Sequence, residues 1–205
     1  MAVLCHECRH ERFTFPCGEL HVRLVGQAPP VASLTLEWER SDDLLELLLL
    51  VDALRRAGST LGLLRIPYVP FSRQDRVAVP GEPLSVAVFA ALINSLHAEA
   101  VEIFDPHSDV TPALLDRCRV VTQADVFWPL FEGKTGFYLV APDAGALKKV
   151  WQLAARTKPL GVIECSKRRA VQTGELTGFA LRRPEPWVHG MPCYLVDDIC
   201  DGGGT

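Results

Sequence analysis

The segment SDDLLELLLLVDALRRAGSTLGLLRI, residues 41–66, carries the clearest fold signal in this sequence. Ser41 suits a helix N-cap, the two aspartates after it favour a first helical turn, and the two arginines shortly before Gly58 favour a last one. Leucines lie on nearly every face of this helix, which indicates burial on several sides or a subunit contact. The apolar run 61–66 is typical of a buried strand, so the segment predicts a helix packed on a sheet.

Helix and strand continue to alternate along the rest of the chain. The pattern predicts helices over 85–97 and 144–156 and strands over 100–104, 137–141, 160–165 and 193–196. Such alternation predicts an α/β fold with mainly parallel sheets flanked by helices. The pattern restarts after the segment PLFEGKTG, which indicates two α/β domains, residues 1–134 and 135–205. Because nothing follows Thr205 to complete its sheet, we expect the second domain to be incomplete.

The composition is that of a folded protein with a small-molecule site. With 205 residues, 48% of them hydrophobic and 22% charged, the chain has the balance of a globular domain. Its net charge of −4 provides no basic field for a nucleic-acid backbone, so local groups must hold any anionic ligand. Apolar runs such as 47–51 are far shorter than the ~20 residues of a membrane span. We therefore expect neither a nucleic-acid partner nor a membrane partner.

The cysteines indicate a reducing compartment. Seven of them, irregularly spaced in a chain without an N-terminal signal segment, predict reduced thiols and a cytoplasmic location. The segment CHECRH places Cys5 and Cys8 near histidines, which suggests zinc, but a structural zinc site needs four ligands and one C-x-x-C pair supplies two. An exposed N-terminal strand is the simpler interpretation of this segment.

Polar segments follow four of the predicted strands, at the points where ligands bind in α/β sheets. They are PYVPFSRQDR, DPHSD, PDAG and DDICDGGGT, which come after Ile66, Phe104, Ala141 and Val196. Taken alone, each has a simple structural interpretation, such as a helix N-cap for Asp143. The last is the most specific, because its glycines let backbone N–H groups converge on a phosphate. Asp197 and Asp198 repel phosphate, so they would accept hydrogen bonds from sugar hydroxyls or hold a metal through water.

The segment DDICDGGGT resembles the phosphoribosyl-diphosphate loop of type I phosphoribosyltransferases. Together with LLLLVDALRRAG, IPYVPFSRQDR, FDPHSD, APDAGALKKV and SKRRA, it has the order and spacing of ribose-phosphate diphosphokinase from about Phe13 to Thr205. That family makes phosphoribosyl diphosphate from ribose 5-phosphate and ATP. The resemblance implies two tandem phosphoribosyltransferase-like domains, a site between them and across subunits, and a homo-oligomer, either a dimer or a hexamer.

The resemblance also implies roles for individual residues, with FPCGE as the adenine-side loop and SKRRA as a basic turn that carries the active-site lysine. The ATP-binding residues are Phe15, Cys17, Gly18, Glu19, Arg73, Gln74 and Asp75; the Mg²⁺ residues are His107 and Asp143; the catalytic residues are Lys167 and Arg169; and the ribose 5-phosphate residues are Arg169, Asp197, Asp198, Asp201, Gly202, Gly203, Gly204 and Thr205. Histidine suits magnesium better as a water-mediated or weak ligand than as a dominant one.

The implied reaction needs no nucleophilic side chain, because the substrate supplies the attacking group. The ribose anomeric hydroxyl attacks the β-phosphorus of ATP in line, and AMP leaves. Lys167 and Arg169 would stabilise the charge that gathers on the transferred group, as positioned cations do in other phosphoryl transfers. Taken alone, SKRRA would be interpreted as a solvated basic turn.

Several positions depart from the family pattern. Cys17 stands where the family usually has Asp or Asn, which removes a strong hydrogen-bond acceptor from the nucleotide pocket. Val77, Val79 and Gly81 stand where further basic residues are common. The second change predicts weaker ATP contacts, a lost allosteric response or a divergent subgroup.

Two other functions remain open at this point. A phosphoribosyltransferase would use the same final loop to consume phosphoribosyl diphosphate, although it has no need for SRQDR. A non-catalytic subunit that regulates a synthetase should lack catalytic groups, yet Lys167 and Arg169 are present. A phosphate loop also needs the N–H groups of a following helix. We therefore expect residues 1–205 alone to be a fragment with weak activity or none.

Overall fold

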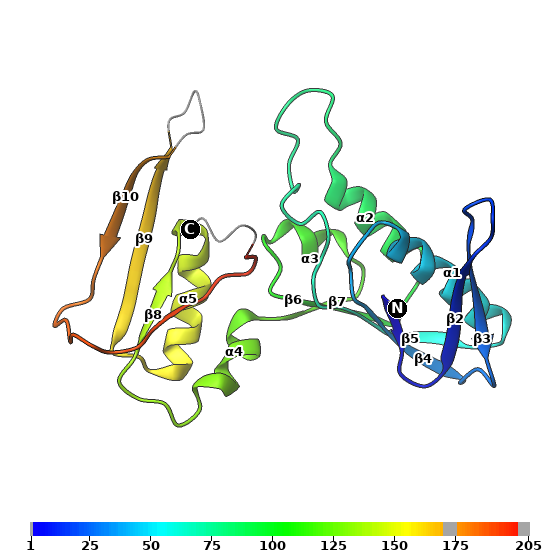
Figure 1. The fold of residues 1–205 in the computed structure, drawn as a ribbon, viewed down its shortest axis with the longest axis horizontal. Helices are drawn as coiled ribbons and strands as arrows, with labels where there is room; N and C mark the ends of the chain where they lie inside the picture. Colours follow the sequence, from blue (N-terminus) through cyan, green and yellow to red (C-terminus); the bar gives the residue numbers. More distant parts are fainter. Residues whose placement is uncertain (1, 170–175, 201–205) are drawn as a thin grey trace. The chain divides into compact units, whose positions relative to one another are not determined.

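The computed structural model describes residues 2–169 and 176–200, without the side chains of 167–169 and 176–179 (Figure 1). The chain divides into two compact units, Met1–Val121 and Thr122–Thr205. Sequence analysis placed the domain boundary near Lys134. The structural division comes earlier because helix α4 (Gln123–Phe131) packs against helix α5 (Ala144–Thr157) of the second unit.

Unit 1 is built on a five-stranded sheet with the order β1-β4-β5-β6-β7. The strands are β1 (Val3–Cys5), β4 (Val31–Leu36), β5 (Thr60–Ile66), β6 (Ala100–Phe104) and β7 (Cys118–Val121), and the helices are α1 (Asp42–Arg56), α2 (Ser85–Asn94) and α3 (Val110–Leu114). Strands β4 to β7 are parallel, and β1 pairs antiparallel with β4. Leu34, Leu64 and Ile103 from neighbouring strands are fully buried in the core of this unit.

Helix α1 begins differently from the sequence-based expectation. Ser41 is the N-cap residue, as predicted, but it has helical backbone angles and its side chain makes no capping hydrogen bond. The carboxylate of Asp43 reaches back instead, and its Oδ2 accepts the backbone N–H groups of Glu39 and Arg40 at 2.8 Å each. Asp43 therefore ties the segment that leads into α1 to the first turn of the helix.

A β-hairpin that sequence analysis did not predict lies against α1 in unit 1 (Figure 1). Its strands β2 (Arg9–Thr14) and β3 (Leu20–Val25) pair antiparallel and form a two-stranded sheet of their own. The connecting turn is closed by hydrogen bonds from Phe15 N to Glu19 O, at 2.9 Å, and from Gly18 N to Phe15 O, at 2.8 Å. Gly18 has φ +93°, a backbone region that favours glycine.

Unit 2 contains a four-stranded sheet with the order β10-β9-β8-β11. The strands are β8 (Tyr138–Ala141), β9 (Gly161–Arg169), β10 (Leu176–Arg182) and β11 (Cys193–Leu195). Strands β9, β8 and β11 are parallel, and β10 pairs antiparallel with β9. Phe137, Leu139, Val150 and Leu153 are buried between this sheet and α5.

The segment SKRRA is not the basic turn that the sequence predicted. The backbone of β9 continues through Arg169, and Lys167 is paired with Phe179 of β10. Pairing with an antiparallel neighbour gives this stretch ladder hydrogen bonds, which a local sequence pattern does not reveal.

Both units contain parallel strands packed against helices, so the predicted α/β class is confirmed. Across residues 2–169 and 176–200, helices are all too short or too polar to cross a bilayer.

Candidate active site

In unit 1, two of the predicted loops leave the same edge of the sheet. Strands β5 and β6 are parallel neighbours with Ile66 opposite Ile103, so the segments that follow them both start at the carboxyl edge. This is where ligands bind in open α/β sheets. The predicted ATP residues after β5 and the predicted magnesium residue after β6 therefore belong to one edge of unit 1.

The ATP residues after β5 lie in a tight turn that presents them to solvent. Phe71 has φ +62°, and its carbonyl accepts the N–H of Gln74 at 2.8 Å. Arg73 and Gln74 are exposed, and Asp75 is half-buried. An exposed guanidinium in such a turn can reach a phosphate and bind two of its oxygens at once.

His107 lies on the loop after β6, and its side chain is exposed. The loop starts at Asp105, which has φ +40° and donates its N–H to the carbonyl of Val121 at 2.9 Å. This bond ties the loop to the end of β7. His107 is thereby presented to solvent at the same edge as Arg73.

The predicted adenine residues form the turn of the β2–β3 hairpin. Phe15 is 45% exposed, with its ring centroid 5.3 Å from Phe13 and 5.7 Å from His21. Cys17 and Glu19 are exposed on the same turn. Figure 1 shows this turn at the far end of the hairpin, separate from the loop after β5. The structure brings the turn residues together, but it does not bring them to Arg73 of the same chain.

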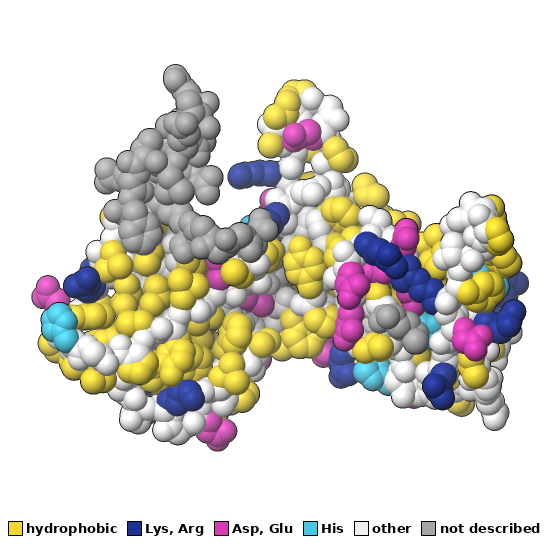
Figure 2. Space-filling model, viewed as in Figure 1, with side chains coloured by type: hydrophobic (Ala, Val, Ile, Leu, Met, Phe, Trp, Pro, Cys, Tyr) yellow, Lys and Arg dark blue, Asp and Glu magenta, His cyan; other side chains and the backbone are white. Residues whose placement is uncertain are grey.

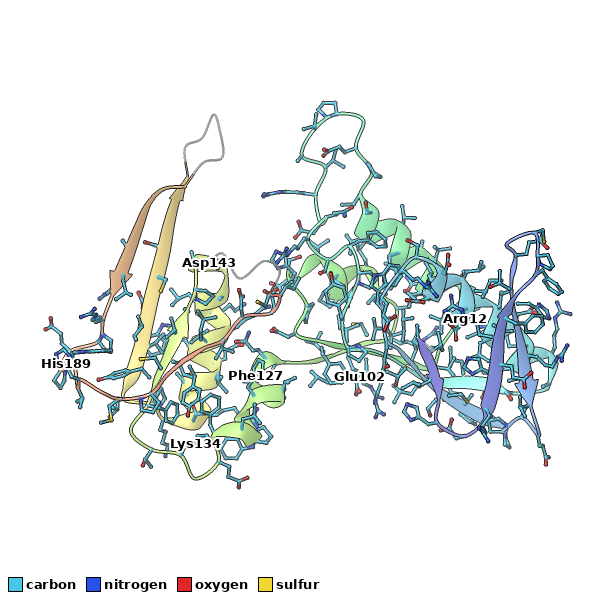
Figure 3. All side chains as sticks on the ribbon, in the orientation of Figure 1. Arg12, Glu102, Phe127, Lys134, Asp143 and His189 are labelled. Carbon is cyan, nitrogen blue, oxygen red and sulfur yellow. The ribbon has the colours of Figure 1, made fainter. Side chains whose placement is uncertain are left out.

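In unit 2, two aspartates follow the carboxyl ends of adjacent strands. Asp143 comes after β8 and Asp197 comes after β11, and the N–H of Val196 donates to Val140 O at 3.2 Å to hold these strands together. Asp143 stands at the start of α5 (Figure 3), where its Oδ1 accepts the N–H groups of Gly145 at 2.9 Å and Ala146 at 3.1 Å. The N-cap interpretation of Asp143 is therefore confirmed. Both capping hydrogen bonds go to the same carboxylate oxygen, Oδ1.

The aspartates of this edge form an acidic cluster. Burial raises the pKa of Asp197, and so does a side-chain hydrogen bond with Asp198. The backbone N–H of Asp198 lowers this pKa and the charges of Asp198 and Asp143 raise it, so that the pKa lies above its ordinary value. Lys149 Nζ lies 3.5 Å from Asp198 Oδ2. A partly desolvated group of carboxylates favours a cation or hydroxyl donors as its ligand.

Strand β9 brings the predicted catalytic residues to the same edge of the unit 2 sheet. Its Glu164 pairs with Ala141, the last residue of β8, so the backbone of Lys167 and Arg169 continues beyond the carboxyl end of β8. Their side chains are outside the described part of the structure. The predicted phosphate residues Asp201, Gly202, Gly203, Gly204 and Thr205 lie wholly outside the described residues.

Lys149 is a site residue that sequence analysis missed. It lies in the quoted segment APDAGALKKV, next to Lys148, and the sequence alone does not separate the two lysines. Strand β11 pairs with β8, the strand that leads into α5, and Asp198 follows β11. This pairing brings Asp198 close to Lys149 on α5. The sequence signal that could have pointed to Lys149 is a basic residue on the helix that follows Asp143.

The two predicted magnesium residues belong to different units. Within the described part of the chain, three or more His, Cys, Asp or Glu side chains do not gather in a way that could hold a metal ion. His107 belongs to unit 1 and Asp143 to unit 2. A magnesium ion at either residue would complete its shell with water and phosphate oxygens, as this ion commonly does.

The CHECRH segment has a structural explanation. It includes the end of β1, an edge strand, and Cys5 and Cys8 pack against the core of unit 1. Burial raises the pKa of the Cys8 thiol to about 12, with further contributions from a hydrogen bond and charge at Cys5 and from the charge of Glu7. Metals bind the thiolate form of cysteine, which this environment disfavours.

Known proteins resemble this chain over most of its length. Residues 31–96 match the model of the N-terminal domain of ribose phosphate pyrophosphokinase. A ribose-phosphate pyrophosphokinase of Thermococcus kodakarensis is 37% identical over 195 residues, which cover 93% of this chain and 67% of the relative. One from Pyrococcus abyssi is 32% identical, with coverage of 93% of this chain and 66% of the relative.

The fold is also found in a solved structure. The crystal structure of phosphoribosylpyrophosphate synthetase from Mycobacterium smegmatis superposes with a TM-score of 0.74 at 21% identity, covering 96% of this chain and 65% of the other. At 21% identity the structural similarity shows a shared fold, whereas the relatives found by sequence show the family. On that basis the chain belongs to the ribose-phosphate pyrophosphokinase family.

Proposed function

We propose that the protein is a magnesium-dependent ribose-phosphate diphosphokinase. It would transfer the diphosphoryl group of ATP to the C1 hydroxyl of ribose 5-phosphate, giving 5-phosphoribosyl 1-diphosphate and AMP. The observation that carries the proposal is the acidic edge of unit 2, where Asp143 and Asp197 follow adjacent parallel strands. The backbone of Lys167 extends past the same edge.

Asp197 and Asp198 would bind the ribose ring. Partly buried carboxylates accept hydrogen bonds from sugar hydroxyls. Each such bond to Asp197 would offset part of the desolvation that raises its pKa. The ion pair between Lys149 and Asp198 would hold the second carboxylate in place. Residues 201–205 remain the predicted cradle for the 5-phosphate.

The ATP side of the site would lie on unit 1. Arg73 and Gln74 are exposed at the carboxyl edge, where they could contact the phosphates, while Phe15 would stack on the adenine. Because the hairpin turn lies away from Arg73 in one chain, a homo-oligomer would let one copy supply the turn and another the phosphate contacts (Figure 1). Figure 2 shows apolar side chains on the surface of unit 2, which offer a further surface for subunit contacts.

The residues fit magnesium as a loosely held ion. Asp143 offers a carboxylate oxygen beyond the one that caps α5, and His107 offers an exposed imidazole on the other unit. When bound with ATP, magnesium neutralises charge on the phosphate oxygens of the transferred group. Each of the two residues would orient the water shell of an ion bound at its own unit.

In the transfer step, the side chains act by position and charge. Lys167 and Arg169 would stabilise the negative charge that spreads over the transferred diphosphoryl group as the C1 hydroxyl attacks. The aspartates of the acidic edge would hold the ribose so that this hydroxyl lies in line with the leaving AMP. Water has to be excluded from the same place, because it would otherwise compete as the nucleophile.

An assay of AMP formation tests the proposal directly. AMP should appear only when ATP, ribose 5-phosphate and Mg²⁺ are all present, and Lys167→Ala should reduce kcat by about 100-fold or more. Lys134→Ala changes an exposed lysine in a loop of the same unit and should retain full activity. Consumption of phosphoribosyl diphosphate with a nucleobase, without any dependence on ATP, would instead identify a phosphoribosyltransferase.

A further inference from the structure

We propose that Arg12 is a positioning residue for the nucleotide-binding turn, because it fixes the β2–β3 hairpin on α1 through a buried ionic network. The inference rests on the proposed function, in which Phe15–Glu19 contact the adenine nucleotide. It adds a residue that binds no substrate but sets where the turn lies.

The network joins the hairpin to the first turns of α1. Arg12 Nη1 lies 2.7 Å from Glu46 Oε2 and 3.3 Å from Asp43 Oδ1, and the Arg12 side chain lies beside the helix (Figure 3). The side chains of Asp43 and Glu46 are 1% and 0% exposed, whereas that of Arg12 is 17% exposed. These are short, charge-assisted contacts in a largely dry place, so their geometry is strict.

Other partners complete the network around the two carboxylates. His10 Nε2 lies 3.0 Å from Glu46 Oε1, and Asp43 Oδ2 accepts the N–H groups of Glu39 and Arg40, just before α1. Arg40 lies 3.9 Å from Asp43 Oδ1, but its side chain is 65% exposed. Arg12 thus supplies a largely buried positive charge that contacts both carboxylates. Removing that charge would leave two buried anions poorly compensated.

The hairpin depends on side chains for its orientation. Strands β2 and β3 form a separate two-stranded sheet, and such a ribbon is marginally stable unless it packs on something. Val22 of β3 contributes a buried apolar contact to the unit 1 core. Apolar contact is non-directional, whereas the two charge-assisted hydrogen bonds that Arg12 Nη1 donates fix an angle. The apolar side of the hairpin therefore binds it to unit 1, and Arg12 sets its tilt.

The two faces of the hairpin separate positioning from binding. In the strand register, Arg12 is opposite Val22, and both point to one face. Phe13 is opposite His21 on the other face, and their rings lie 5.1 Å apart. Phe15 packs on this aromatic face. A change in tilt at Arg12 would displace the aromatic face and the turn together.

The test compares Arg12→Met with Arg12→Lys and with Arg40→Met in the full-length protein. Methionine keeps the length of the side chain without its charge, so we expect KM for ATP to rise about 10-fold and KM for ribose 5-phosphate to stay within about 2-fold. Lysine restores the positive charge on a more flexible side chain and should recover part of the ATP affinity. Arg40→Met removes an exposed partner of Asp43 and should leave both constants unchanged.

Hydrogen–deuterium exchange separates positioning from a general loss of stability. In Arg12→Met, amides of residues 9–25 should exchange about 10-fold faster, while peptides from β5 and β6 keep their protection. An unchanged KM for ATP in an active Arg12→Met protein would overturn the inference, as would equal rises in both KM values. A wild-type protein that forms no AMP would refute the proposed function before any variant is compared, so the two failures are distinguishable.

Discussion

Replacement of Asp43 by alanine should destabilise unit 1 strongly, because its carboxylate is buried in the first turn of α1. Its carboxylate accepts two backbone N–H groups at 2.8 Å each and Arg12 Nη1 at 3.3 Å, and the side chain is 1% exposed. Hydrogen bonds to a charged acceptor contribute about 1.5 kcal/mol or more each, so the two backbone bonds together are worth roughly 3 kcal/mol. We expect ΔΔG of unfolding to be about 3 kcal/mol.

Urea titration followed by hydrogen exchange of peptides from α1 and β4 measures this loss within unit 1. With an m-value of about 2 kcal/mol/M, the midpoint should fall by roughly 1.5 M. Asp42→Ala is the matched control, because its carboxylate is 67% exposed and 4.0 Å from Arg12, and it should cost less than about 0.5 kcal/mol. A shift for Asp43→Ala no larger than that of the control would refute the reasoning.

The pH dependence of stability gives the same prediction a second test. Burial raises the pKa of Asp43, but hydrogen bonds from Glu39, Arg40 and Arg12 outweigh it, so the pKa is lowered from its ordinary value of 3.8. A carboxyl with a lowered folded pKa contributes stability above its unfolded pKa and loses it as pH falls through the folded value. Below pH 3.8, wild-type unit 1 should therefore lose stability more steeply than Asp43→Asn.

Three further predictions concern the core, the acidic edge and the cysteines. Leu50→Ala should cost about 2–5 kcal/mol in urea unfolding because this side chain is fully buried, whereas Leu45→Ala, at a position 44% exposed, should cost about 1 kcal/mol or less. Asp143→Asn should keep the α5 N-cap, and with it the thermal stability, yet lose AMP formation. Asp143→Ala should lose AMP formation and also about 1 kcal/mol of stability. At pH 8, iodoacetamide should label exposed Cys17 well before Cys8, whose thiol pKa is raised to about 12, as read by peptide mass spectrometry.

Periodic segments made most of the α/β frame predictable. The helix expected over 41–58 is α1, Asp42–Arg56, and the strand expected over 61–66 is β5, Thr60–Ile66, because long apolar patterns with clear ends determine local structure strongly. The hairpin was missed because its strand Arg9–Thr14 carries charged and polar residues on the face that packs against α1. An ionic contact between distant segments leaves no periodic apolar signal.

The candidate site was partly predictable for a related reason. The rule that ligands gather at the carboxyl ends of parallel strands located Asp143 and Asp197 without knowledge of the sheet order. The ion pair between Lys149 and Asp198 could not be predicted from the sequence, because it depends on the pairing of β11 with β8. The role of Arg12 depends on tertiary packing in the same way.

The most direct test of the account is to follow the phosphorus atoms of ATP by ³¹P NMR during turnover of the full-length protein with ribose 5-phosphate and Mg²⁺. Diphosphoryl transfer predicts that the β and γ signals move together into 5-phosphoribosyl 1-diphosphate while AMP accumulates in equal amount. Formation of ADP, or of free phosphate with the ribose 5-phosphate unchanged, would contradict it.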